Sequence, residues 1–210
     1  LDIAFCYLEE QHRAEDAELT DILNSMRAGT LKMKHLRLLQ SRIGIKPEGP
    51  ITKLYTLNYD VERENEIELS KLKGDTHYFL RTSKARSSQE LAQLQNNVLA
   101  PEILKLKVGA LVMTVKNDPM KRWVNGSIGT IVKFNVGGLP VVQFQNGGVY
   151  SIAPEEWEHT SGGASLSQIP LRLAYAITVH KSQGMTLDSA LIDLSKAFVG
   201  GMGYVALSRV

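Results

Sequence analysis

Two spacings of hydrophobic positions alternate over the first half of the chain. Segments with helical spacing of apolar residues are 17–26, 31–43 and 61–72. Shorter segments with strand-like patterns are 3–8, 51–58 and 76–81. A glycine lies shortly after each helical segment and predicts its end. Strands and helices that alternate in this way predict an α/β fold built on a parallel sheet.

A different pattern fills residues 108–157. Short β-branched segments are separated there by Asn-Gly, Gly-Gly and Asn-Gly-Gly turns, which are typical of hairpins in a small barrel or an antiparallel sheet. Residues 161–168 then predict a flexible return, and the apolar segment 171–179 predicts a strand of a buried parallel sheet. Because strand and helix patterns flank it on both sides, we interpret 108–157 as a small all-β barrel inserted into an α/β domain made of 1–107 and 158–210.

Composition narrows the class of protein. With 210 residues and 43% hydrophobic side chains, the chain can bury a real core. Its 24 basic and 22 acidic side chains nearly cancel, so a nucleic-acid site would have to be local. The single cysteine, Cys6, fits a reducing compartment, and the scattered histidines lack metal-site spacing. No apolar segment approaches the ~18 residues of a membrane span. Both ends of the chain lie inside apolar patterns, so we expect the chain to be a fragment of a longer protein.

The predicted strand 171–179 runs into a group of polar and small residues, HKSQG, at 180–184. In open α/β sheets ligands gather at the carboxyl ends of the strands. Lys181 offers positive charge, Ser182 offers a hydroxyl donor, and Gly184 allows the backbone to approach a ligand closely. A lone His-Lys pair favours a solvated loop, and the pattern is also compatible with an anion site.

Several segments resemble superfamily one DNA helicases of the Pif type and their RecD-like relatives. AYAITVHKSQGMTLD resembles their fifth conserved motif, GMGYVALSRV the sixth, and CYLEEQHRAEDAELTDILNSMRAG the fourth. KLYTLNYDVERENEIELSKLKGD resembles a segment in which Asn58 opens a loop before a helix. VGALVMTVKNDPMKRWVNGSIGTIV resembles the small β-barrel that these enzymes insert into their second motor domain. The resemblance runs in family order from about residue 5 to residue 210.

This resemblance implies the second RecA-like motor domain of a P-loop NTPase fold, with the barrel inserted in it. No phosphate loop of the form Gly-x-x-x-x-Gly-Lys-Ser/Thr occurs in the chain. The first motor domain, which would hold most of an ATP molecule and its Mg²⁺, is therefore expected upstream of Leu1. Alone, the fragment is expected not to hydrolyse ATP, and no metal site of its own is expected.

By position in the motifs, the resemblance assigns Arg13 and Arg209 to the γ-phosphate of ATP, with Gly184 and Thr186 bordering the nucleotide. Thr186 stands where relatives outside this branch often carry glutamate. Guanidinium suits the role because it stays charged and binds phosphate oxygens in a fork. The residues alone leave other interpretations open: Arg13 lies among acidic neighbours, and Arg209 ends a predicted helix whose dipole favours a cation.

For nucleic acid, the resemblance places Asn58, Thr178, His180, Lys181 and Ser182 along a single DNA strand. Short polar donors and a lysine bind phosphates without reading sequence, as a translocating motor requires. A second basic stretch lies inside the predicted barrel and consists of Lys116, Lys121, Arg122 and Trp123. It is compatible with a DNA grip and also with an ordinary hairpin whose tryptophan folds inward.

The function implied is the C-terminal half of an ATP-dependent helicase that moves 5′ to 3′ on single-stranded DNA. Its expected partners are single-stranded and forked DNA and the upstream motor domain, with no membrane, and we expect a monomer. The expected location is the cytoplasm and nucleoid of a bacterium, or the nucleus or mitochondrion of a eukaryote. Two alternatives stay open: a non-catalytic module that binds DNA or protein, and a subunit of a RecD-like nuclease complex.

Overall fold

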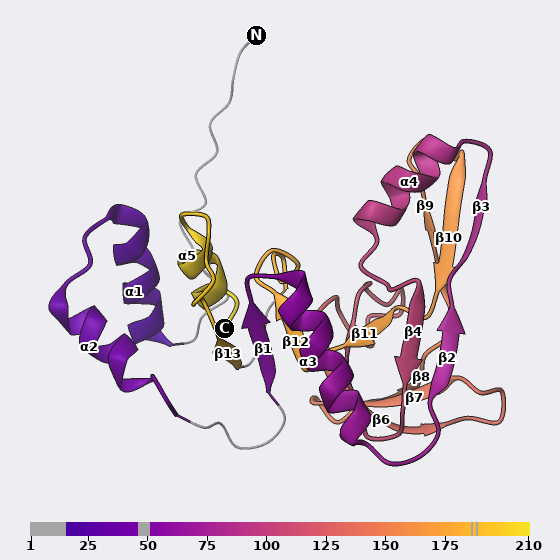
Figure 1. The fold of residues 1–210 in the computed structure, drawn as a ribbon, viewed down its shortest axis with the longest axis horizontal. Coiled ribbons are helices and arrows are strands. Elements are labelled where there is room, and N and C mark those ends of the chain that lie inside the picture. Colours follow the sequence, from indigo (N-terminus) through magenta and orange to yellow (C-terminus); the bar gives the residue numbers. More distant parts are fainter. Residues whose placement is uncertain (1–15, 46–50, 186, 188) are drawn as a thin grey trace, which may run out of the picture.

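The computed structural model describes residues 16–45, 51–185, 187 and 189–210 (Figure 1). The predicted strand at 3–8 lies outside the described residues. The helices are α1 (Ala17–Ala28), α2 (Met33–Ser41), α3 (Asn58–Lys71), α4 (Ser88–Asn97) and α5 (Met202–Leu207). The strands are β1 (Thr52–Tyr55), β2 (His77–Leu80), β3 (Thr82–Ala85), β4 (Ile103–Leu106), β5 (Leu111–Thr114), β6 (Ile128–Phe134), β7 (Pro140–Phe144), β8 (Val149–Ser151), β9 (Glu155–Glu158), β10 (Ala164–Gln168), β11 (Leu171–Leu173), β12 (Ala176–Thr178) and β13 (Ala190–Ile192).

A parallel sheet lies near the middle of the molecule, as predicted (Figure 1). Its strand order is β12-β1-β13, and both neighbours pair in parallel with β1. Leu54 and Ile177 on adjacent strands are fully buried, and Ala206 of α5 packs into the same cluster. Helix α3 packs against β1 and β12. The chain is thus a mixed α/β fold whose central sheet is a buried parallel one.

The outer edge of β12 is closed by a side chain. The amide of Asn65, which is 7% exposed, donates from Nδ2 to the carbonyl oxygen of Ala176 at 3.0 Å. Its Oδ1 accepts from the backbone N–H of Ala176, also at 3.0 Å. A carboxamide carries the same donor and acceptor as a peptide unit, so Asn65 takes the place of a neighbouring strand.

The hairpins predicted in 108–157 are present, in a five-stranded sheet of order β11-β5-β6-β7-β8 whose pairings are all antiparallel. The described residues do not form a closed barrel, because β11 and β8 stand at opposite ends of that order. Strand β9, which was expected within the barrel, pairs instead with β10 in the sheet β3-β10-β9. Trp123 and Phe144 stack in the core beneath the large sheet, with ring centroids 5.5 Å apart.

Three further predictions need correction. The single strand expected at 171–179 is divided, since β11 pairs antiparallel with β5 and β12 pairs parallel with β1. The strand expected at 76–81 exists as β2, but it pairs antiparallel with β4 and does not join the parallel sheet. The return expected to be flexible at 161–168 contains strand β10, whose alternate residues Ala164, Leu166 and Gln168 are buried.

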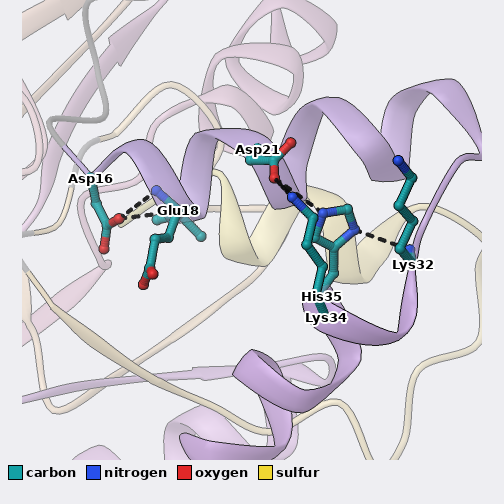
Figure 2. A network of polar contacts seen from close by, with 7 residues as sticks. Asp16, Glu18, Asp21, Lys32, Lys34 and His35 are labelled. Atoms are coloured by element: carbon teal, nitrogen blue, oxygen red, sulfur yellow. Dashed lines mark hydrogen bonds and ion pairs between the residues drawn. The ribbon is translucent and has the colours of Figure 1, made fainter.

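A polar network joins α1 to α2 (Figure 2). The carboxylate of Asp16 accepts from the first-turn N–H groups of α1 and caps that helix. Asp21 accepts from the Lys34 ammonium at 2.6 Å and lies 3.1 Å from Nε2 of His35. Nδ1 of the buried His35 accepts from the N–H of Lys32 at 3.1 Å. The contacts of Lys34 and His35 lower the pKa of Asp21 below its ordinary value.

Candidate functional site

The carboxyl ends of β12, β1 and β13 meet at one edge of the parallel sheet. After β12 the chain forms the turn that contains His180 and Lys181, and after β1 it enters α3 at the exposed Asn58. After β13 it forms the segment 193–201, which leads to α5. The fold therefore brings the candidate DNA-binding residues to the same edge of the sheet, where ligands gather in open α/β sheets.

The turn after β12 is built by its own hydroxyl groups. Thr178, 3% exposed, accepts at Oγ1 from the N–H of Lys181 at 3.2 Å. Ser182, which is fully buried, donates from Oγ to the carbonyl of Val179 at 2.8 Å. Thr178 and Ser182 thus face inward and fix the backbone, whereas His180 is exposed and Lys181 is half-buried. Both hydroxyl groups therefore make hydrogen bonds inside the turn.

Gly184 follows at the exposed end of this turn with φ +86°. Residues with a Cβ rarely adopt that left-handed region, so glycine is favoured here by the backbone itself. Its neighbour Met185 lies against a loop of the large antiparallel sheet, since a Cβ placed on Gly126 would meet the Cβ of Met185 at 3.0 Å. The turn is therefore in contact with both sheets.

A second cation, Arg172 on β11, lies near Lys181 in a place that the motif comparison did not single out. Burial lowers the pKa of the Lys181 ammonium, and the positive charge of Arg172 lowers it further, while Glu62 of α3 opposes this. Burial also lowers the pKa of Arg172. Nε of Arg172 is buried without a hydrogen-bond partner among the described residues. Two partly desolvated cations close enough to influence each other's charge favour the binding of an anion.

Arg209 connects α5 to the same turn. Its guanidinium, in a residue 9% exposed, donates to the carbonyl of Val205 at 3.2 Å, to that of Met185 at 3.3 Å and to Oγ of Ser208 at 2.8 Å. The carbonyl of Arg209 accepts from the N–H of Leu187 at 2.7 Å. The side chain is therefore directed at the turn next to Gly184. The candidates Arg13 and Thr186 lie outside the described residues.

The segment after β13 is tied to the start of α3. The ammonium of Lys196 contacts both carboxylate oxygens of the buried Asp60 at 2.8 Å. The hydroxyl of Thr56 donates to the carbonyl of Lys196 at 3.1 Å. This segment therefore has a fixed position beside Asn58.

Most of the basic stretch of the antiparallel sheet folds onto the protein, while Lys121 is exposed. Trp123 is 7% exposed, so the interpretation with the tryptophan folded inward is confirmed. The Arg122 guanidinium lies over its ring at 4.6 Å and binds the Asp118 carboxylate at 2.7 and 2.9 Å. That contact lowers the pKa of Asp118 to about 2. Lys116 binds Glu155 at 3.2 Å.

A cavity of about 500 Å³ lies between this sheet and the turn at Gly184. Neutral amide and hydroxyl side chains dominate its polar wall, namely Asn117, Asn125, Ser127, Gln145 and Asn146. No cluster of metal-ligating side chains occurs among the residues that the structure describes. None of the helices in these residues is long and apolar enough to cross a membrane.

Comparison with known proteins shows which proteins this chain resembles. Residues 91–134 match the family model for the 2B domain of DNA helicase Pif1. The chain is 34% identical to the ATP-dependent DNA helicase Pif1 of Psychrobacter sp., over 100% of the chain and 41% of that protein. It is 39% identical to human ATP-dependent DNA helicase PIF1, over 94% of the chain and 32% of that protein. The chain is homologous to the C-terminal part of Pif1 helicases.

Solved Pif1 structures have the same fold. Unliganded Pif1 from Bacteroides sp. superposes with a TM-score of 0.80 at 28% identity, over 95% of this chain and 48% of that one. A Bacteroides Pif1 complex with ADP-AlF3 and single-stranded DNA superposes with a TM-score of 0.65 at 28% identity, over 95% of this chain and 48% of that one. The chain thus spans less than half the length of the Pif1 helicases named here.

Proposed function

We propose that the chain is the second motor half of an ATP-dependent DNA helicase that translocates 5′ to 3′ on single-stranded DNA. Residues 1–107 and 158–210 would form the RecA-like motor domain and 108–157 an inserted β module. A first motor domain elsewhere in the same protein would hold most of the ATP and its Mg²⁺. Homology to the C-terminal part of Pif1 helicases supports the proposal, because the named relatives are ATP-dependent DNA helicases.

The observation that carries this proposal is the shared turn. Lys181 lies in the turn after β12, and its N–H is bonded to Thr178. Arg209 follows α5 and donates to the carbonyl of Met185 at the end of the same turn. We assign Lys181, His180 and Asn58 to direct contact with the DNA strand, and Thr178 and Ser182 to shaping the turn. We assign Arg209, with Arg13, to the γ-phosphate, and Gly184 and Thr186 to the border of the nucleotide.

The coupling follows from the contacts of Arg209. A guanidinium that turns toward a phosphate exchanges its bond to the Met185 carbonyl for a stronger charge-assisted one. Met185 lies three residues from the buried Ser182 that fixes the turn. Binding and hydrolysis of ATP would therefore alter the position of Lys181, and with it the grip on the strand.

The nucleotide assignment is tested in the full-length protein with Arg209→Ala and Arg209→Lys. Lysine keeps the charge and lacks the planar fork, so both variants should lose about a thousandfold or more of DNA-stimulated ATP hydrolysis. Single-strand affinity, measured by fluorescence anisotropy, should be retained in Arg209→Lys. ATP hydrolysis near the wild-type rate in both variants would contradict the assignment.

The strand assignment is tested with Lys181→Ala. Loss of one phosphate contact should weaken binding and reduce the slope of log affinity against log salt by about 0.7. Lys71→Ala removes an exposed cation at the other end of α3 and is the matched control. An unchanged affinity and slope in Lys181→Ala would favour the alternative of a module that does not grip single strands.

A further inference from the structure

Phe198 is a large aromatic side chain that the fold leaves on the surface. It is 64% exposed and follows β13, in the segment that leads to α5. Its ring lies 6.2 Å from the ring of His180, centroid to centroid, with 33° between their planes. His180 is itself exposed, so two aromatic rings stand together at the carboxyl edge of the parallel sheet.

The exposure of Phe198 does not come from a loosely attached loop. Two residues earlier, Lys196 is held by the Asp60 carboxylate at 2.8 Å and by the Thr56 hydroxyl at 3.1 Å. The N–H of Ala197 donates to the carbonyl of Leu194 at 2.9 Å. The backbone is therefore fixed immediately before the ring. An exposed aromatic ring on an anchored turn keeps apolar surface in water and contributes no burial free energy to the fold.

The surroundings indicate what covers the ring. Lys181 follows His180 directly in the sequence, and the polar Asn58 begins α3, after the neighbouring strand β1. Cations beside exposed aromatic rings are the combination that binds single-stranded nucleic acid, since phosphates meet the charge and bases stack on the rings. An apolar protein partner would desolvate the Lys181 ammonium further without adding a counter-charge to it.

We propose that Phe198 and His180 form a stacking platform for one base of the bound strand. This inference rests on the proposed function, and it adds a base contact to a site otherwise made of phosphate contacts. Every base has a π-face, so the platform holds the strand without selecting sequence. Movement of the turn at residues 178–184 would shift His180 relative to the anchored Phe198 and so release or grip the base.

The test compares two probes in the full-length protein. One is a fluorescent oligothymidylate, and the other is an oligomer of equal length made of abasic sugar-phosphates. Phe198→Ala should weaken binding of the thymidylate about fivefold or more, the lower range for one stacked base, and leave abasic binding unchanged. Phe198→Trp should restore thymidylate binding. Val199→Ala, which trims a neighbouring side chain that is 53% exposed, should change neither probe.

The outcomes separate this inference from the function on which it rests. Equal losses on both probes would mean that Phe198 supports the turn and does not stack on bases. Unchanged affinity in Phe198→Ala, together with weaker binding in Lys181→Ala, would refute the platform alone. If Lys181→Ala also binds as tightly as wild type, the strand site itself is refuted.

Discussion

Asn65 allows a quantitative test of how strand β12, which leads into the turn at Lys181, is held. Its side chain makes two buried hydrogen bonds of 3.0 Å, to the N–H and the C=O of Ala176 on the edge strand β12. Asn65→Ala leaves both backbone groups without their partner. Each orphaned buried group costs about 1–3 kcal/mol, so local opening of β12 should become easier by about 2–6 kcal/mol.

The assay is amide hydrogen exchange of the full-length protein, followed by mass spectrometry on peptides that cover 171–179. Because about 1.4 kcal/mol is tenfold, exchange in β12 should accelerate about 30- to 20,000-fold. Asn65→Asp keeps an acceptor for the Ala176 N–H and loses the donor to its carbonyl. The lost donor is replaced by a carboxylate oxygen that faces the Ala176 carbonyl in a buried place, so exchange in this variant should be no slower than in Asn65→Ala.

Ile67→Ala is the control, because Ile67 lies on the same helix and is 43% exposed. Surface changes of this kind alter stability by about 0.5 kcal/mol or less, so exchange in β12 should stay within about threefold of wild type. If Asn65→Ala behaves like Ile67→Ala, the side chain does not support the edge strand and the reasoning is wrong.

Two further predictions concern charged groups. Removing the cation in Arg172→Met should raise the pKa of Lys181 toward its ordinary value, because the charge of Arg172 lowers it. Reductive methylation of Lys181 as a function of pH, followed by mass spectrometry, should then begin at higher pH than in wild type. An unchanged profile would contradict the proximity of the two cations. Asp118 has a pKa lowered to about 2, so its contact with Arg122 should stabilise the loop fully above the ordinary carboxyl pKa and be lost as pH falls toward 2. Trp123 fluorescence in a Trp157→Phe background should report that loss, and Arg122→Gln should move its onset to higher pH; coincident profiles would show that the ion pair does not hold the loop.

The parts of the fold that sequence patterns predicted are those in which one segment decides its own structure. Helices α1, α2 and α3 follow directly from apolar spacing, and strands β1 and β2 follow from short strand-like patterns. Strand partners were harder to predict, because pairing depends on residues far apart in the chain. The run 171–179 is mostly apolar, and its one charged residue, Arg172, lies inside β11 and does not mark the point at which the pairing changes from β5 to β1.

The candidate site shows the same division. The position of the HKSQG turn at the end of a strand was predictable, because polar residues follow an apolar run. The inward direction of Thr178 and Ser182 was not, since a hydroxyl has no sequence signal that separates a turn-forming role from a ligand contact. Arg172 had a weak signal as a charged residue inside an apolar strand, and Phe198 had none until its exposure and its neighbour were known.

The division of residues 171–178 between two sheets has a mechanical consequence. Only Ala174 and Tyr175 separate β11 from β12, and both are bonded, the first from its N–H to the carbonyl of Leu111 and the second at its carbonyl by the N–H of Lys53. Such a short, doubly bonded link transmits tension with little stretch. A pull applied to the antiparallel sheet would reach the turn at Lys181 along one extended segment. The same stiffness would carry a movement of that turn back to the antiparallel sheet, so the two could not move independently.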